Sequence, residues 1–417
     1  MPWLGWQGGV LHAEAVSLPD LAAQHGTPAW VYSAQALRHN WQAFAGALAG
    51  RPALLCYAVK ANANLSILRI FAEAGAGFDI VSGGELARVL AAGAPASKVV
   101  FSGVGKSREE ILAALQAGVK CFNVESAAEL QRINRLACER GLRAPVSLRV
   151  NPDVDAHSHP YISTGLKDNK FGIPHAEALA LYQEASRLPG LRLCGIDCHI
   201  GSQITAMEPF MAALEKMLEL ITALAGQGIM LEHLDLGGGL GITYTDETPP
   251  PPEAFLGTIL ARLAQHPLAR TLEVVFEFGR ALVGNAGLLL TRLEYLKRNG
   301  ARGFAVVDAA MNDLIRPALY QGYHQIVEVD PPVELAPALY DVVGPVCESG
   351  DWLGKDRLLR LRGSDDLLAI LSAGAYGMAM SSNYSSRPRA VEVLVDGTAT
   401  RVIRPRESFA SMLQGEV

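Results

Sequence analysis

The sequence predicts an α/β protein: a (β/α)₈ barrel of the TIM type followed by a C-terminal β-rich domain, a sandwich or barrel. Three observations favour this fold class. The 417 residues suffice for two domains. Between residues 30 and 280, short β-branched runs alternate with amphipathic helical runs, and after residue 280 the helical periodicity fades. Residues 1–29 also look strand-like, so we expect them to join the domain of residues 281–417.

The first domain contains eight candidate strands and eight candidate helices. The strands are expected at 53–59, 77–82, 98–103, 119–124, 146–151, 194–200, 233–237 and 273–278. Helices are expected at 64–74, 84–92, 107–117, 126–140, 175–187, 208–226 and 253–265, and one more at 35–48 precedes the first strand and could close the ring. This alternation fits a barrel. A doubly wound open sheet has the same periodicity, although no GxGxxG motif follows an early strand.

Two features of the later sequence refine this division. Asp396 and Gly397 separate two β-rich runs within residues 391–403, which predicts a hairpin because its turn needs positive φ. The proline run at 249–252 is interpreted as a loop insertion, since helical pattern resumes at once.

Composition excludes several classes of protein. The formal net charge of -6 gives no electrostatic reason to bind nucleic acid or an anionic membrane. The six cysteines form no CxxC pair, which favours reduced thiols. The N-terminus lacks the features of a secretory signal, and no apolar stretch is long enough to span a bilayer. We therefore expect a cytoplasmic protein without membrane or nucleic-acid partners.

The carboxyl ends of the predicted strands carry most of the candidate chemistry. Lys60 ends the first strand, where burial would disfavour its charge and suit a Schiff base, although a lysine that solvates a strand end is the simpler alternative. Other strand ends supply Asp79, His199, Ser202, Gly237, Gly238, Gly239, Glu277, Gly279 and Arg280. In a parallel barrel these ends share one face, where glycine N–H groups and an arginine can hold a phosphate.

Some cysteine and histidine residues lie close together in the sequence but lack the arrangement of a metal site. Cys194 and Cys198 are an even number of positions apart on a strand, whereas His199 points to the other face, so we expect no metal site. His157 and His159 have no carboxylate at ligand spacing and are interpreted as solvated or substrate-loop residues.

The β-rich domain contains three segments of interest, which hold Arg316 and Tyr320, Cys347 and Glu348, and Tyr376. A cysteine beside a glutamate can equally be an inert core thiol.

Long, ordered motifs then make the chain resemble the diaminopimelate decarboxylases, pyridoxal-phosphate enzymes of the alanine-racemase-like fold group. The motifs are YAVKAN, DIVSGGE, RVNPDVDAHSHPYISTGLKDNKFGI, HIGSQI, LDLGGGLGI, DAAMNDLIRPALY, GPVCESGD and GAYG, and they run over nearly the whole chain. The resemblance implies a cofactor barrel at residues 30–280, a β-rich domain, and a homodimer whose active sites are completed across the interface.

The resemblance also implies roles for single residues. Lys60 would bind the cofactor covalently, His199 would stack on its ring, and Glu277 would pair with the pyridine nitrogen. Cofactor contacts would come from Asp79, Ser202, Gly237 to Gly239, Phe278, Gly279, Arg280 and Tyr376. Cys347 and Glu348 would come from the partner subunit, with Cys347 as the acid that protonates the carbanion.

The substrate follows from charge. Meso-diaminopimelate keeps a free carboxylate, which calls for Arg280 and Arg316 with Tyr320 and Tyr376, and a free ammonium, which calls for Glu348. The product would be L-lysine. A related decarboxylase of ornithine, arginine or carboxynorspermidine, a racemase and a non-catalytic pyridoxal-phosphate carrier are the alternatives. The sequence departs from the family at Phe278, where proline is usual, and at Ser385, where asparagine is more usual.

Overall fold

The computed structural model describes residues 1–155 and 169–416, so that His157 and His159 lie outside the described residues. The chain separates into two compact units. The barrel unit comprises residues 40–242 and 248–281, and the β-rich unit comprises residues 1–39, 243–247 and 282–417.

Within the described residues, eight parallel strands close the barrel. In ring order they are β5 (Ala53–Ala58), β6 (Gly77–Ile80), β7 (Val99–Phe101), β8 (Cys121–Val124), β9 (Ala144–Asn151), β11 (Leu191–Asp197), β12 (His233–Asp235) and β13 (Glu273–Phe278). The pairing of β13 with β5 completes the ring, which confirms the predicted barrel and excludes the open sheet. A short strand, β10 (Ile173–Pro174), adds to the edge of β9.

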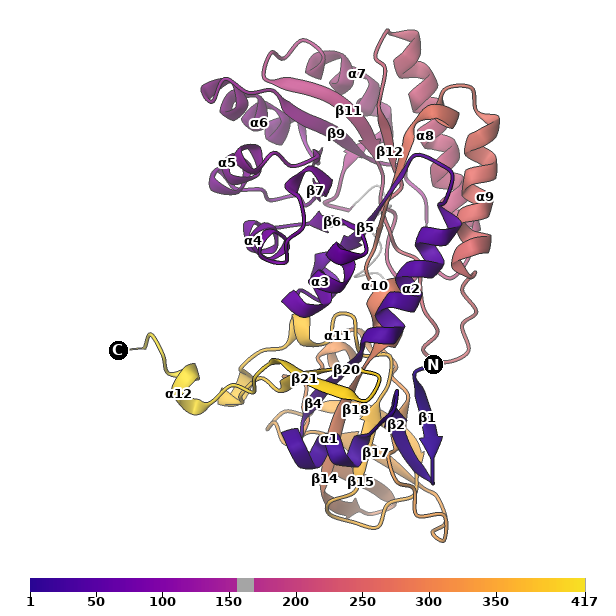
Figure 1. The fold of residues 1–417 in the computed structure, drawn as a ribbon, viewed down its shortest axis with the longest axis vertical. Helices are drawn as coiled ribbons and strands as arrows, with labels where there is room; N and C mark the ends of the chain where they lie inside the picture. The colour runs from indigo at the N-terminus through magenta and orange to yellow at the C-terminus, as the bar shows by residue number, and fades with distance from the viewer. Residues whose placement is uncertain (156–168, 417) are drawn as a thin grey trace. The chain divides into compact units, whose positions relative to one another are not determined.

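Helices alternate with these strands and cover the barrel (Figure 1). They are α2 (Ala34–Ala47), α3 (Leu65–Glu73), α4 (Gly83–Ala91), α5 (Arg108–Ala117), α6 (Ala127–Glu139), α7 (His175–Ala185), α8 (Glu208–Gly226) and α9 (Pro252–Gln265). The boundary between the two units falls within α2, whose Phe44 stacks 4.5 Å from Phe278 of β13. The predicted helix 35–48 therefore does cover the seam where the ring closes.

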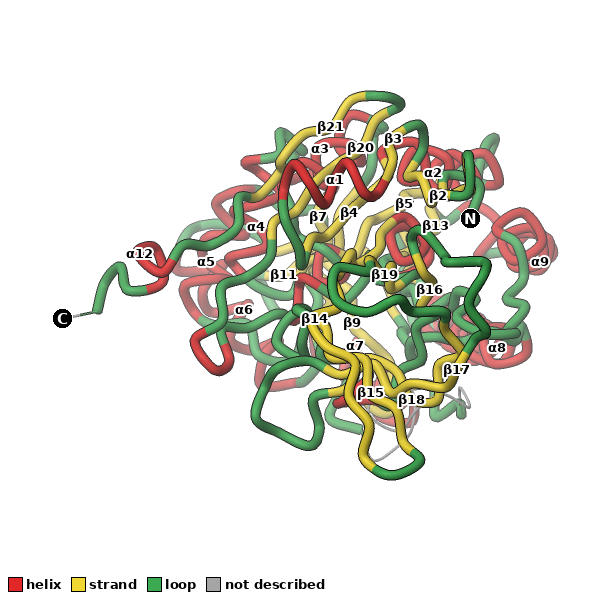
Figure 2. Tube along the Cα trace, turned by 90° about the horizontal axis from the view of Figure 1, so that it is seen from below, coloured by secondary structure: helices red, strands yellow, loops and turns green. Residues whose placement is uncertain are grey.

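The β-rich unit is organised around one long strand, β14 (Gly287–Asn299), which pairs with three others (Figure 2). Its main sheet has the order β18 (Trp352–Leu359), β17 (Ala338–Val343), β15 (Arg302–Val307), β14, β4 (Ala29–Ser33), β20 (Val391–Asp396) and β21 (Ala399–Arg404). Off this path, β16 (Ile326–Glu328) pairs with β19 (Leu367–Ile370), which pairs with β14. The predicted hairpin is confirmed: β20 and β21 pair around Gly397, whose φ is 64°.

The N-terminal segment belongs to the β-rich unit, and so does more of the chain than the sequence suggested. A small sheet of β1 (Leu4–Gln7), β2 (Val10–Ala13) and β3 (Val16–Ser17) precedes α1 (Leu18–His25). Strand β4 follows, and because it pairs with β14 and β20, the β-rich unit extends past residue 30. Residues 243–247, from the loop after β12, also belong to it.

Three short helices complete the description: α10 (Arg280–Val283), α11 (Arg316–Tyr320) and α12 (Phe409–Met412). No helix in the described parts of the chain is both long and apolar enough to cross a membrane.

Candidate active site

Lys60 lies at the carboxyl end of β5, in a short turn between the buried residues Val59 and Ala61. Its Nζ is 2.6 Å from Oδ2 of Asp79, which lies in the neighbouring strand β6 and is fully buried. The Lys60 side chain itself is 36% exposed, so the burial that the sequence suggested is only partial. Asp79 Oδ1 is buried and has no hydrogen-bond partner among the described residues, so this carboxylate can accept a further donor.

Three further buried carboxyl groups lie at the carboxyl ends of β11, β12 and β13 inside the barrel. Oxygens of Asp197, Asp235 and Glu277 all lie within 4.8 Å of one another. Burial is the main cause that raises the pKa of Glu277 well above its usual value, and the charges of Asp235 and Asp79 raise it further. Burial and Asp197 raise the pKa of Asp235 to about 8. The cluster therefore holds protons near neutral pH and favours a cation beside it.

A neutral amide contacts this acidic cluster, and a nearby cation acts on it through its charge, because burial raises the pKa of Asp197 and Arg149 opposes that rise. Asn123 Nδ2 donates to Glu277 Oε1 and to Asp235 Oδ2, each at 3.4 Å. Arg149, also buried, pairs with Glu125 at 2.8 Å. The sequence analysis missed Asp197 and Asp235, although an aspartate inside each apolar strand, CGIDCHI and HLDLG, is a visible signal that could have found them.

His199 follows β11, and a backbone contact orients its ring. Gly238 N–H donates to His199 Nδ1 at 3.2 Å, so this nitrogen carries the lone pair. Burial lowers the pKa of His199 well below its usual value, with help from the charges of Arg149 and Lys60. His199 is therefore a neutral aromatic ring, held in one orientation, at the end of the barrel strands.

The glycine loop after β12 needs glycine for close packing. A Cβ on Gly238 would lie 2.1 Å from the carbonyl oxygen of Glu277, and Gly237 and Gly239 have φ values of 62° and 101°. The backbone N–H of Gly237 donates a hydrogen bond to Asp235, and that of Gly238 donates one to His199. Both N–H groups are therefore used within the protein, so we expect a phosphate to be approached by Gly239.

Arg280 and Ser202 are brought together as the sequence predicted. Arg280 Nη2 donates to Ser202 Oγ at 3.1 Å, which joins the loop after β11 to the end of β13. Gly279 lies between them and Lys60: a Cβ there would be 2.9 Å from Cβ of Ala61. The structure thus gathers a hydroxyl, a guanidinium and closely packed backbone beside the glycine loop.

Phe278 faces away from this chemistry. Its ring packs on Phe44, Phe255 and Phe276 at centroid distances of 4.5, 6.0 and 5.6 Å. Adjacent strand residues point to opposite faces, so Phe278 is directed toward the helices and Glu277 into the barrel. The phenyl ring that replaces the family's proline therefore extends a group of packed aromatic rings.

Of the predicted substrate residues, Arg280 lies in the barrel unit and the others lie in the β-rich unit. Arg316 begins α11, is 7% exposed, and donates from Nη1 to His324 Nε2 at 2.7 Å. Its guanidinium carbon also lies 4.9 Å from the ring centroid of Tyr244. Neither contact neutralises the positive charge. Tyr320 ends the same helix.

The other three predicted residues lie in loops of this unit. Cys347 and Glu348 are exposed, and Tyr384 donates its hydroxyl to Glu348 Oε2 at 2.8 Å. The alternative of an inert core thiol is therefore wrong for Cys347. Tyr376 adopts a left-handed backbone conformation with φ of 55°, which is strained for a tyrosine and typical of functional loops.

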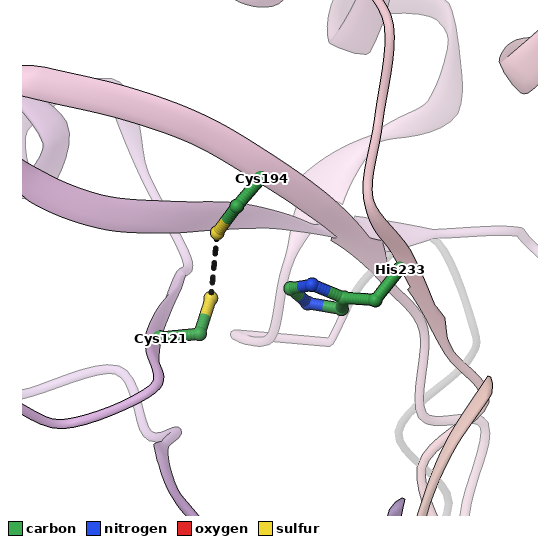
Figure 3. Close-up of side chains that lie close together, drawn as sticks. All are labelled: Cys121, Cys194 and His233. Atoms are coloured by element: carbon green, nitrogen blue, oxygen red, sulfur yellow. Dashed lines mark hydrogen bonds between the residues drawn. The ribbon is translucent and has the colours of Figure 1, made fainter. Parts of the chain in front are cut away.

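Cysteines and a histidine also meet at the opposite end of the barrel strands (Figure 3). Cys194 Sγ lies 3.6 Å from Cys121 Sγ, near the ring of His233. All three are buried, and Cys194 also donates to the carbonyl oxygen of Val146 at 3.2 Å. This grouping differs from the one considered from the sequence, because Cys194 meets residues of other strands and not Cys198 and His199.

Comparison with known proteins agrees with this site. Residues 34–284 match the family model described as pyridoxal-dependent decarboxylase, pyridoxal binding domain. A diaminopimelate decarboxylase of Pseudomonas aeruginosa is 56% identical over 416 residues, covering 100% of this chain and 99% of the relative. The chain belongs to the diaminopimelate decarboxylases.

Solved structures extend this relationship to the whole fold. Diaminopimelate decarboxylase from Helicobacter pylori, complexed with L-lysine, has a TM-score of 0.91 and 40% identity over 95% of this chain and 98% of that chain. The enzyme from M. jannaschii, also with L-lysine, has a TM-score of 0.94 and 35% identity over 99% and 97%. A lysine/ornithine decarboxylase from Vibrio vulnificus, at 23% identity, shares the fold alone.

Membership of the family confirms the predicted enzyme class, a carboxy-lyase, and the predicted cofactor, pyridoxal phosphate. The residues present fit this group. The free oxygen of Asp79 and the protonated cluster at Glu277 suit a pyridinium cation, and the glycine loop with Ser202 and Arg280 suits a phosphate.

Proposed function

We propose that this protein removes CO₂ from meso-2,6-diaminopimelate to give L-lysine, the last step of lysine biosynthesis, using pyridoxal phosphate. The full-length match at 56% identity to a diaminopimelate decarboxylase carries this conclusion, because it includes the β-rich unit with Arg316. A decarboxylase of ornithine, arginine or carboxynorspermidine is disfavoured because only the diacid needs the arginine pair. A non-catalytic carrier is disfavoured because it needs no second domain.

The barrel residues bind and tune the cofactor in this proposal. Lys60 forms the covalent link, and Asp79 orients its amine at 2.6 Å. Glu277 pairs with the pyridine nitrogen and keeps it protonated, and His199 packs on the ring. When bound, the protonated ring accepts the electron pair that remains when CO₂ leaves. Contacts to the phosphate come from Ser202, Gly239, Gly279, Arg280 and Tyr376, while Gly237 and Gly238 shape the loop.

The β-rich unit supplies substrate specificity. The distal carboxylate of the substrate is bound by Arg316 and Arg280, with hydrogen bonds from Tyr320 and Tyr376. The distal ammonium is bound by Glu348. The neighbouring thiol of Cys347 gives its proton to the carbon that has lost CO₂, and this carbon becomes the amine-bearing end of L-lysine, whose L-centre is the unreacted distal end.

Cys347 and Glu348 act in the site of a partner subunit, and the protein is a homodimer in this proposal. Their exposure in the single chain supports a role at an interface. Mixing Lys60→Ala and Cys347→Ala variants tests it, because one of the two sites in each mixed dimer has both residues intact. Reassociation should restore about a quarter of wild-type activity if subunits exchange freely. No recovery in demonstrated mixed dimers would contradict sharing.

We also propose a cytoplasmic location. All six cysteines are unpaired as free thiols, which is the state expected in a reducing compartment.

The substrate is tested by measuring CO₂ release with added pyridoxal phosphate. The panel is meso-diaminopimelate, L-lysine, L-ornithine and L-arginine, and only the first should be turned over efficiently. Efficient release from ornithine or arginine, or from none of the four by cofactor-loaded protein, would overturn the proposal.

A further inference from the structure

His324 lies in the loop between α11 and β16 and is completely buried. Both of its ring nitrogens face polar atoms. Nε2 is 2.7 Å from Arg316 Nη1, and Nδ1 is 2.8 Å from the carbonyl oxygen of Leu371. The imidazole therefore bridges the proposed substrate-binding arginine to the backbone of a different segment.

These two contacts fix the protonation of the ring. A guanidinium can only donate hydrogen bonds, so Nε2 of His324 must be the acceptor and carry no proton. A carbonyl oxygen can only accept, so Nδ1 of His324 carries the proton. The imidazole is thus neutral, in one tautomer, and an imidazolium could not make the contact to Arg316.

His324 and its hydrogen-bond partner Leu371 lie next to paired strands. Leu371 N–H donates to the carbonyl oxygen of Gln325 at 2.8 Å, which continues the pairing of β16 with β19. Tyr244 packs edge-on against His324, with centroids 5.3 Å apart, while its face lies below the Arg316 guanidinium. Arg316 is therefore held from two directions by groups that leave its charge intact.

We propose that His324 is a positioning residue for substrate specificity: it fixes the orientation in which the Arg316 guanidinium binds the distal carboxylate of the substrate. This inference rests on the proposed function, because it assumes that Arg316 recognises a diacid. His324 touches neither substrate nor cofactor in this role and acts through Arg316 alone.

Two substitutions separate the two hydrogen bonds. In His324→Asn the amide nitrogen can replace Nδ1, but no acceptor reaches Arg316. In His324→Gln the longer amide places an oxygen near the position of Nε2. We expect His324→Asn to raise the KM for meso-diaminopimelate about tenfold or more, with kcat changed less than about threefold, and His324→Gln to recover most of the loss.

L-Lysine keeps the distal carboxylate, so its inhibition constant should rise together with KM in His324→Asn and recover in His324→Gln. 1,5-Diaminopentane lacks that carboxylate, so its inhibition constant should stay unchanged in both variants, whereas a general packing defect would raise it. In an Arg316→Ala background, His324→Asn should add no further increase in KM. His233→Asn is the matched control for loss of a buried histidine in the barrel, and it should lower thermal stability without moving KM.

Several results would overturn this role for His324. These are equal KM increases in the Asn and Gln variants, a matching rise in the 1,5-diaminopentane inhibition constant, or additive effects with Arg316→Ala. If His324→Asn does not fold, Tyr244→Leu takes its place, because it removes the second support of the same guanidinium and should raise KM with the same selectivity. Failure of the wild-type enzyme to turn over meso-diaminopimelate would instead refute the proposed function itself.

Discussion

The two units of this chain build their charged centres in opposite ways. The barrel crowds carboxyl groups of like charge, Asp79, Asp197, Asp235 and Glu277, into a buried interior. The β-rich unit holds one buried guanidinium, Arg316, against a neutral imidazole and a tyrosine ring.

The difference shows two ways to keep a charge available for a ligand. Crowded acids repel one another, so their pKa values rise and a bound cation relieves the repulsion. An arginine cannot lose its proton, so it is instead fixed by neutral partners that satisfy some of its donors. The barrel centre is thus suited to a pyridinium ring and the β-rich centre to a carboxylate.

The largest expected effect is that of Lys60→Ala, which removes the amine that carries the cofactor. Activity should fall by at least about a thousandfold, because covalent attachment and its proton transfers are both lost. Purified protein should also lack the visible absorption band of lysine-bound cofactor. Lys98→Ala is the control, since Lys98 only donates to the carbonyl oxygen of Gly75. A persisting band with turnover would show that another lysine binds the cofactor.

Glu277→Gln tests the barrel centre next. It keeps the shape of the side chain but cannot hold a proton on the pyridine nitrogen, so kcat should fall about a hundredfold. In cofactor-free protein the same change should raise the free energy of unfolding above pH 8, because it removes one member of the repelling cluster. If kcat is unchanged, another group keeps the pyridine nitrogen protonated.

Arg316→Ala tests the β-rich centre. Loss of one partner of a desolvated charge pair costs about 2 kcal/mol or more, so the KM for meso-diaminopimelate should rise about thirtyfold. Inhibition by L-lysine should weaken by a similar factor because L-lysine keeps the distal carboxylate, whereas inhibition by 1,5-diaminopentane, which lacks it, should hardly change. Arg298→Ala, at an exposed position near the end of β14, is the control. An equal loss for the diacid and 1,5-diaminopentane would refute recognition of the distal carboxylate by Arg316.

The smallest effect on catalysis is expected from Asp235, which is tested by the pH dependence of stability in cofactor-free protein. The pKa of Asp235 is raised from 3.8 to about 8 by folding, so the folded state binds the proton more tightly than the unfolded chain. Stability should therefore decline as pH rises from about 4 to about 8. Asp235→Asn should flatten this decline in denaturant titrations at several pH values. An unchanged slope would mean that Asp235 is not the group that titrates.

Sequence order predicted the barrel centre better than the β-rich centre. Lys60, Asp79, His199 and Glu277 each end a strand, and parallel strands bring their ends to one face whatever their separation in sequence. Asp197 and Asp235 end β11 and β12, but the predicted strands continue to residues 200 and 237, which places both aspartates inside apolar runs and not at the strand ends.

The surroundings of Arg316 could not be predicted in this way. Tyr244 follows a barrel strand, yet residues 243–247 belong to the β-rich unit. His324 was overlooked because a lone histidine in a loop has no pattern. Phe278 is a second residue whose surroundings could not be predicted. The sequence identified it as a departure from the family, but it did not show that the ring packs against Phe44 and Phe255.

The sequence by itself determined the alternation of elements, the hairpin at Gly397, the family and most of the residues with chemical roles. These properties follow from local periodicity, turn geometry and ordered motifs. Only the tertiary structure decided which charges repel, which nitrogen of His199 and of His324 carries the proton, and what holds Arg316. Those depend on distances and burial, which arise when segments far apart in the chain are packed together.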